Sequence, residues 1–341
     1  MKANLKNMTI RELEVFFENI GEKKFRAKQV FAWLYRGAYS FDDMSDLSKS
    51  LREKLEEAAL IEKLSQIRVQ TSEKDGTRKY LFGLNDGNSI ESVFMKYKFG
   101  NTICISSQAG CRMGCSFCAS TFHGLQRNLT ASEMVDQIIG VEKDTGEKIG
   151  NVVVMGTGEP LDNYENLTKF IELIHSPDGM NMGLRNITVS TCGIIPKIKE
   201  FAKDFPQVNL AISLHAPNDK IRNAIMPVNK SYGVEDLLSV CKQHIEKTGR
   251  RITFEYALVK GINDSEKNAE ELAAKLRGMI CHVNLIPLNR VAESGLKGTD
   301  RVDAERFRDY LIKRGIEATI RRDLGSDIDA ACGQLRLKNK M

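Results

Sequence analysis

Three closely spaced cysteines are the residues of this sequence best suited to hold a metal. Cys111, Cys115 and Cys118 stand in the stretch CRMGCSFCAS, with the spacing Cys-x3-Cys-x2-Cys. A structural zinc site would need a fourth ligand, for which Cys104 and His123 are the nearest candidates. An iron–sulfur cluster held by three thiolates would instead leave one iron open to bind a substrate or cofactor.

The remaining cysteines favour the cluster over zinc. Cys104 falls within a predicted strand, and the sequence has no second Cys-x2-Cys pair. Cys192, Cys241 and Cys281 match no metal-binding pattern, so we assign them to packing. The eighth cysteine, Cys332, stands near the carboxyl end in DAACGQL, where polar and glycine residues predict a flexible tail with an exposed thiol.

Strand and helix patterns alternate from about residue 102 onward. Six β-branched, apolar stretches are each followed by an amphipathic helical stretch, and they read TICISS, NVVVMG, NITVST, VNLAISLH, RITFEYALV and HVNLIPL. Near-continuous apolar strands that alternate with helices predict a parallel α/β sheet covered by helices. An open doubly wound sheet and a partial (β/α)6 TIM-like barrel both fit this pattern.

Polar and glycine residues gather where these strands end, the place at which parallel α/β folds bind ligands. Each has an ordinary structural alternative: glycines form tight turns, Ser and Asn cap helices, and a histidine can be satisfied within the fold. Their shared position at one rim favours a site. The candidates are Gly156, Gly158, Glu159, Ser190, Thr191, Ser213, Leu214, His215 and Asn289.

The rest of the chain predicts smaller units around this core. Residues 1–62 are expected to form a helical accessory domain, whose first helix has the capping-box pattern of Thr9 and Glu12. Residues 63–96 alternate around the turns KDGT and NDGN, which predicts a short antiparallel β-hairpin linker of two or three strands. Residues 97–327 would form the α/β core and residues 328–341 a carboxyl-terminal tail.

Composition limits the cellular context. The 341 residues carry a net charge of +5, which permits nucleic-acid binding without showing it. The amino-terminal residues have no apolar signal-peptide core, and no apolar run is long enough to span a bilayer, so we expect a cytoplasmic monomer that does not bind membranes. Basic candidates for phosphate contact, although such runs are usually solvated surface, are Lys23, Lys24, Arg26, Lys28, Arg250 and Arg251.

Several motifs together resemble one family. The cysteine triad after the first strand and GTGEP after the second are similar to the radical S-adenosylmethionine (SAM) enzymes. Within them the chain resembles the RlmN/Cfr family through ESVFMKY, CISSQAGCRMGCSFCAS, STCGIIPKI, VNLAISLHAPND, IMPVN and RRDLGSDIDAACGQL. The resemblance runs from about residue 10 to residue 337 and implies a partial (β/α)6 barrel core.

The resemblance also implies an activity. RlmN-type members methylate C2 of an adenosine in the peptidyl-transferase centre of 23S rRNA and of the adenosine 3′ of the anticodon in tRNA. The implied substrates are naked or partly assembled 23S rRNA and tRNA, and a flavodoxin or ferredoxin would be the reductant. Cfr-like members methylate C8 of the same rRNA adenosine; Pro160 in GEPL, where Cfr-like sequences tend to carry alanine, favours C2. A non-catalytic RNA-binding protein with a structural metal is the alternative from another class.

Roles for individual residues follow from the same resemblance. Cys111, Cys115 and Cys118 would hold a [4Fe–4S] cluster whose open iron binds SAM. Cys332 would be methylated by one SAM and activated by a second, and Cys104 would resolve the protein–RNA adduct through a transient disulfide. Either Glu91 or Cys104 would accept the C2 proton. The remaining implied residues are the SAM contacts Gly158, Glu159, Ser190, Ser213, Leu214, His215 and Asn289. Taken alone, Cys332 would more often be a buried apolar residue and Glu91 a solvent-facing strand residue.

Overall fold

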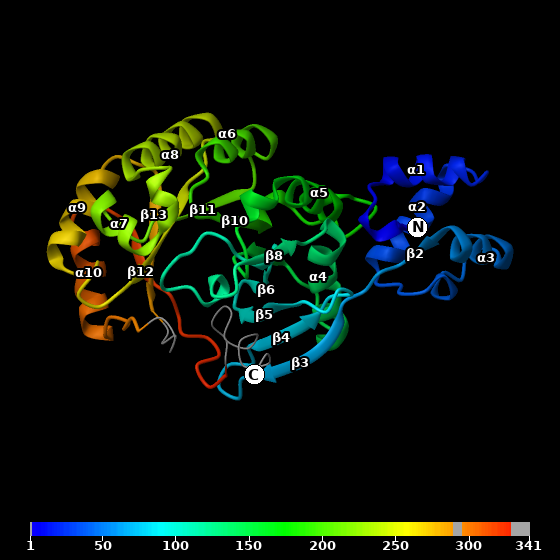
Figure 1. The fold of residues 1–341 in the computed structure, drawn as a ribbon, viewed down its shortest axis with the longest axis horizontal. Coiled ribbons are helices and arrows are strands. Elements are labelled where there is room, and N and C mark those ends of the chain that lie inside the picture. Colours follow the sequence, from blue (N-terminus) through cyan, green and yellow to red (C-terminus); the bar gives the residue numbers. More distant parts are fainter. Residues whose placement is uncertain (1, 289–294, 329–341) are drawn as a thin grey trace.

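A ten-stranded sheet forms the centre of the computed structural model, which describes residues 2–288 and 295–328 (Figure 1). Its strand order is β14-β13-β12-β11-β10-β9-β6-β5-β4-β3, and every neighbouring pair from β6 to β14 is parallel. The parallel strands are β6 (Gly100–Ile105), β9 (Asn151–Val154), β10 (Ile187–Thr191), β11 (Asn209–Ser213), β12 (Ile252–Leu258), β13 (Cys281–Pro287) and β14 (Ala318–Ile320).

Helices connect these strands on the outer face of the curved sheet (Figure 1). The parallel strands follow one another in chain order without a reversal, as in a TIM-like barrel, so the doubly wound alternative is wrong and the partial barrel is confirmed. All six predicted strand–helix units are present, and β14 was not predicted. The helices are α4 (Ala131–Thr145), α5 (Tyr164–His175), α6 (Ile195–Asp204), α7 (Asp219–Ile225), α8 (Val234–Thr248), α9 (Glu266–Leu276) and α10 (Arg301–Lys313).

Three antiparallel strands extend the same sheet beyond β6. They are β3 (Ser65–Thr71), β4 (Arg78–Gly83) and β5 (Ser89–Tyr97), joined by turns in which Gly76 and Gly87 have φ of 72° and 81°. Strand β5 pairs with β6 so that Val93 lies opposite Cys104. The stretch expected as a linker therefore forms part of the wall beside the first barrel strand.

The amino-terminal helices pack as a separate lobe beside α4 (Figure 1). They are α1 (Ile10–Asn19), α2 (Phe25–Tyr35) and α3 (Lys49–Ala58), and the capping box of Thr9 and Glu12 is formed as predicted. A buried ion pair joins the lobe to the barrel: Lys6 Nζ lies 2.7 Å from Asp136 Oδ1 on α4 and also donates to Glu62 O. The lobe is thus fixed to the helix that follows the cysteine loop.

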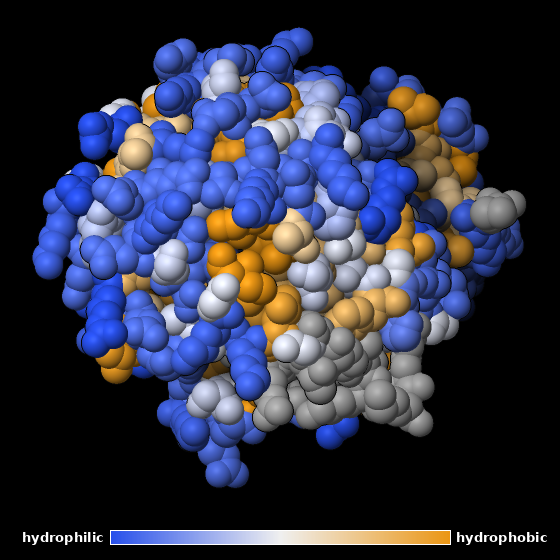
Figure 2. All heavy atoms as spheres, turned by 60° about the vertical axis from the view of Figure 1, so that its left-hand side comes forward, coloured by the Kyte–Doolittle hydropathy of each residue, from blue (hydrophilic) through white to orange (hydrophobic). Residues whose placement is uncertain are grey.

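The outer surface over α7, α9 and α10 is largely hydrophilic. Figure 2 brings this side of the molecule forward and shows an apolar patch near its middle.

Among the described residues, no helix combines the length and apolar character that crossing a membrane requires.

Candidate active site

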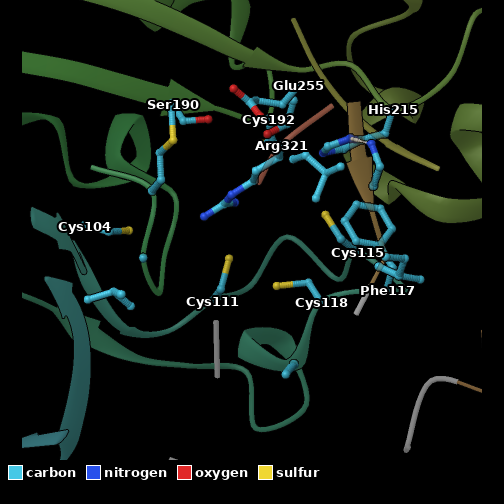
Figure 3. Close-up of a pocket in the computed structure, with 18 of the residues that line it drawn as sticks. Cys104, Cys111, Cys115, Phe117, Cys118, Ser190, Cys192, His215, Glu255 and Arg321 are labelled. Atoms are coloured by element: carbon cyan, nitrogen blue, oxygen red, sulfur yellow. Dashed lines mark hydrogen bonds between the residues drawn. The ribbon is translucent and has the colours of Figure 1, made fainter. Parts of the chain in front are cut away.

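A cavity of about 580 Å³ opens at the carboxyl ends of the parallel strands (Figure 3). The cysteine loop, the loop after β9 and the ends of β10 to β13 all contribute to its wall. The segment 321–328, which follows β14, closes one side of it. Sequence-predicted residues in the wall are Cys104, Cys111, Cys115, Cys118, Gly156, Gly158, Glu159, Ser190, Ser213 and His215.

The cysteine loop is held at both ends by main-chain contacts. It lies between β7 (Gln108–Gly110) and β8 (Leu125–Asn128), and the Cys111 amide donates to Gly124 O. Gly110 has φ of 84°, and a Cβ there would lie 2.0 Å from the same carbonyl oxygen, so only glycine fits. Farther along, the Ser116 amide donates to Ile225 O at the end of α7.

The three cysteine side chains fit an iron–sulfur cluster. Cys111 and Cys115 are buried, Cys118 is half-buried, and their sulfur atoms border one open space in Figure 3. Burial raises the pKa of Cys111 to about 12 and that of Cys115 further, so these thiols keep their protons until a metal displaces them. Within residues 2–288 and 295–328, no group of three His, Cys, Asp or Glu side chains is arranged to hold a single metal ion as it stands.

The GTGEP loop lies against the start of the cysteine loop because its glycines have no side chain. A Cβ on Gly156 would lie 2.7 Å from Ile105 O, and one on Gly158 would lie 2.8 Å from the Gln108 amide. Glu159 is buried, and its carboxylate accepts from the amides of Leu161 (3.0 Å) and Cys192 (2.7 Å). Desolvation raises the pKa of Glu159, against these hydrogen bonds. Its side chain ties the ends of β9 and β10 together.

The end of β11 is held in an unusual backbone conformation. His215 has φ of 56°, a region that costs a non-glycine residue energy. Its Nδ1 accepts from the Ala257 amide at 2.9 Å, and its ring meets the edge of Phe117. Burial lowers the pKa of His215 to about 3, so the ring is neutral. Ser213 lines the cavity, whereas Leu214 is buried behind it.

The residues predicted to take part in the chemical steps differ in their access to the cavity. Cys104 lines the cavity, and Figure 3 shows its sulfur pointing toward the interior. Glu91 is not among the residues that line the cavity. It is only 3% exposed, and its Oε2 lies 2.8 Å from Lys79 Nζ in an ion pair. The alternative that Glu91 is a solvent-facing strand residue is therefore wrong. Cys332 and Asn289 lie outside the described residues.

Four of the wall residues that sequence reasoning missed bear on the chemistry of the site. Cys192, assigned to packing, does pack against Cys115, and it also lines the cavity directly after β10. Glu255 on β12 is buried, accepts from Asn284 Nδ2 at 2.8 Å and is an acid in an otherwise apolar strand, a signal that could have found it. Phe117 and Arg321 are the other two. Cys241 and Cys281 do lie in the core as expected.

Comparison with known proteins agrees with this geometry. Residues 3–61 match the family model of the ribosomal RNA large subunit methyltransferase N-terminal domain, and residues 105–273 match that of the radical SAM superfamily. A protein of Clostridium novyi named "Probable dual-specificity RNA methyltransferase RlmN" is 54% identical, over 98% of this chain and 97% of its own. The chain belongs to the RlmN family. A relative of the same name from Clostridioides difficile is 52% identical, over 99% of each chain.

The RlmN family relationship extends to structure. A radical SAM methyltransferase from Sphaerobacter thermophilus has a TM-score of 0.93 and 44% identity, over 97% of this chain and 98% of its own. The protein is therefore a radical SAM methyltransferase of the RlmN family and not a non-catalytic binding module. The cofactors of this family are a [4Fe–4S] cluster and SAM, and the cysteine loop, the glycine-lined GTGEP loop and the strand-end hydroxyls fit them.

Proposed function

We propose that this protein methylates C2 of a specific adenosine in the peptidyl-transferase centre of 23S rRNA and of the adenosine 3′ of the anticodon in tRNA. The reaction passes through an S-methylcysteine at Cys332 and uses two SAM molecules per turnover. The substrates are naked or partly assembled 23S rRNA and tRNA, and a flavodoxin or ferredoxin supplies electrons.

One observation carries this proposal. The cluster cysteines, Cys104 and the segment that leads into Cys332 all line the same cavity. Ile328, in that wall, precedes Cys332 by four residues, and four extended residues span at most about 14 Å. In this proposal the Cys332 thiol therefore acts in the space between the cluster loop and Cys104.

Each part of the wall then has a role. Cys111, Cys115 and Cys118 hold the cluster, while Gly158, Glu159, Ser190, Ser213, His215 and Asn289 surround SAM, with Leu214 packed behind. When bound, the cluster and SAM supply one-electron cleavage of the sulfonium and hence a hydrogen-abstracting radical. C2 of adenine is electron-poor and carries no acidic proton, so it needs such a radical route to accept a methyl carbon.

The cysteines carry the covalent steps. The Cys332 thiolate, a soft nucleophile, accepts the methyl group, and its methyl carbon later bonds to C2. The Cys104 thiolate then attacks the Cys332 sulfur, so that the S–S bond forms and the bond from that sulfur to the methylene carbon breaks. The electron pair of the broken bond stays on the carbon, which takes up a proton as the methylated RNA leaves. The C2 proton goes to Cys104 or to Glu91. Cavity access favours Cys104, because Glu91 is held by Lys79 away from the wall.

RNA contacts are proposed for the amino-terminal lobe and the cavity rim. On α2, Arg26 lies 4.8 Å over the ring of Phe25, which is 53% exposed and can stack on a base. Lys24 and Lys28 are exposed and form ion pairs with the surface carboxylates of Glu18 and Asp178. Such weak surface pairs can give way to phosphates.

Nucleoside mass spectrometry tests the proposal. The reconstituted protein is incubated anaerobically with SAM, a reductant and either 23S rRNA or tRNA, beside Cys332→Ala as the matched inactive control. We expect 2-methyladenosine in both RNAs from the parent protein and none from the variant. 8-Methyladenosine would replace the C2 assignment with C8, and methylation by Cys332→Ala would refute the S-methylcysteine intermediate.

A further inference from the structure

Arg222 is a fully buried cation on α7 without a carboxylate partner. Its side chain has no exposed surface, and no Asp or Glu of the described residues forms an ion pair with it. Removing a guanidinium from water costs several kcal/mol unless other groups replace the lost solvation. Neutral hydrogen-bond acceptors surround the guanidinium and replace much of that solvation, but they carry no opposite charge.

The guanidinium donates most of its hydrogen bonds to the ends of two barrel strands. Nη2 donates to Cys192 O at 2.6 Å and to Ser213 O at 3.0 Å, and Nε donates to Leu214 O at 3.0 Å. Nη1 donates to Asn229 Oδ1 at 3.0 Å. The carbonyls of Cys192, Ser213 and Leu214 lie at the ends of β10 and β11, the strands that bring Ser190 and Ser213 into the cavity wall. Arg222 thus fixes the spacing of two strand ends at the expected SAM site.

The same helix docks the cysteine loop. Ile225, one turn after Arg222, accepts the Ser116 amide at 3.0 Å and packs with Cys115 and Cys192. The charged or ionisable groups that face Arg222 are Cys192, Cys115, Asp219, Cys241 and the neutral ring of His215. Asp219 is exposed and already accepts from Asn229 Nδ2 and the Val234 amide, so solvent weakens its effect. Toward the cavity, Arg222 therefore faces the thiol that would ligate the cluster.

We propose that Arg222 is the positioning and charge-balancing residue of the cluster site: it holds the strand ends that bind SAM and stabilises the anionic cluster that Cys115 ligates. The inference rests on the proposed cluster ligands. A [4Fe–4S]²⁺ core with three thiolates has a net charge of minus one, and the electron from the external one-electron donor makes it minus two, with no proton transferred. A fixed buried cation favours the reduced state because the attraction grows with the added charge.

Spectroelectrochemistry of the anaerobic, cluster-loaded full chain without RNA tests the charge effect. Arg222→Gln keeps a hydrogen-bonding side chain and removes the cation, and Arg222→Lys keeps the cation and loses the planar fork. For Arg222→Gln we expect an equilibrium constant for cluster reduction that is at least tenfold smaller. For a one-electron couple this corresponds to a reduction potential that is lower by 59 mV or more. For Arg222→Lys we expect a reduction equilibrium within threefold of the parent and at least tenfold weaker SAM binding, because the strand ends lose two or more hydrogen bonds.

The two variants separate the outcomes. Equal potentials in Arg222→Gln and the parent, at matched iron content, would overturn the charge-balancing role. Unchanged SAM affinity in both variants would overturn the positioning role. If Arg222→Gln yields no folded protein, Arg222→Lys carries the test by itself. Because this variant keeps the cation, its reduction equilibrium must stay within threefold of the parent while SAM binding weakens at least tenfold; a tenfold change in the reduction equilibrium or an unchanged SAM affinity would overturn the proposal. Because no RNA is present, these results are independent of whether C2 is the methylated position.

Discussion

The carboxylate of Asp327 accepts a hydrogen bond from Ser72 Oγ at 2.6 Å, and a second from the Glu73 amide at 2.9 Å. Asp327 stands five residues before Cys332, and Ser72 begins the turn between β3 and β4. The Ser72 hydrogen bond is the largest cause of the lowered pKa of Asp327. One wall of the partial barrel thus anchors the segment that delivers the proposed methyl-carrying cysteine.

Loosening this anchor should slow methylation without damaging the cofactor site. In Asp327→Ala we expect a roughly tenfold lower rate of RNA methylation, because the segment that leads to Cys332 loses two hydrogen bonds that orient it. Ser72→Ala should have a smaller effect, and the double variant should be no slower than Asp327→Ala. Iron content and SAM affinity serve as controls. Additive losses in the double variant would show that the two residues act separately.

Cys104→Ala should trap an intermediate rather than prevent its formation. Without the thiol that forms the disulfide with Cys332, the protein–RNA adduct cannot be released, and a Cys104→Ala sample should contain a covalent complex. Denaturing gel electrophoresis with labelled tRNA measures it. A double Cys104→Ala/Cys332→Ala variant is the control and should give no complex. Normal turnover by Cys104→Ala would exclude Cys104 as the resolving residue.

Glu91→Gln tests stability and chemistry together. Lys79 and Glu91 are 1% and 3% exposed, and breaking a buried ion pair by neutralising one of its members typically costs about 3–5 kcal/mol. We expect Glu91→Gln to lower the free energy of unfolding by that order, and Lys79→Met/Glu91→Gln to recover much of it. If the double variant is stable and methylates RNA, Glu91 is not the proton acceptor; if it is stable and inactive with an intact cluster, Glu91 keeps that role.

Gly158→Ala should weaken SAM binding through crowding. The added Cβ would lie 2.6 Å from Gln108 Cβ, and Gly158 has φ of 111°, so the GTGEP loop must move. We expect at least a tenfold rise in the SAM dissociation constant. Gly87→Ala is the matched control, because Gly87 also has positive φ but a Cβ added there would have no atom within 4 Å. Equal SAM affinity in both variants would contradict the close-packing role.

His244 on α8 predicts a pH dependence of stability. It is buried, and neither ring nitrogen has a hydrogen-bond partner among the described residues. Desolvation lowers the pKa of His244 from 6.5 to about 4, so between these values the unfolded chain binds a proton that the folded chain does not. This group therefore destabilises the fold as the pH falls below 6.5.

His244→Leu should remove that dependence. At pH 7.5 we expect the free energy of unfolding of His244→Leu to exceed that of the parent by about 1 kcal/mol, because an unsatisfied polar group leaves the core. The difference in free energy of unfolding between His244→Leu and the parent should widen by about 1.4 kcal/mol at pH 5.5. At that pH only the parent must keep a buried imidazole neutral. Chemical denaturation at the two pH values measures both. A gap that stays constant would mean that His244 is solvated and titrates in the folded protein.

The sequence by itself determined the parallel α/β core and most of its rim, whereas the order of the strands decided between a barrel and a doubly wound sheet. Apolar strands alternating with helices are a local pattern, and the right-handed parallel connection leaves few ways to assemble it. The cysteine spacing and the glycines of GTGEP mark the ends of β6 and β9 for the same reason: a turn or a metal loop requires particular residue types within a few positions. The sequence also predicted rim positions for Ser190, Ser213 and His215, because the carboxyl ends of all parallel strands lie at one edge of the sheet.

Only the tertiary structure decided which side chains from distant segments meet. Glu91 reads as an ordinary strand residue until β4 places Lys79 against it, and Cys192 reads as a core residue until the cysteine loop folds beside it. Arg222 lies in an exposed-looking polar stretch, yet its partners belong to two strand ends and a later loop. Burial and pairing depend on contacts across the fold, and no local pattern in the sequence records them.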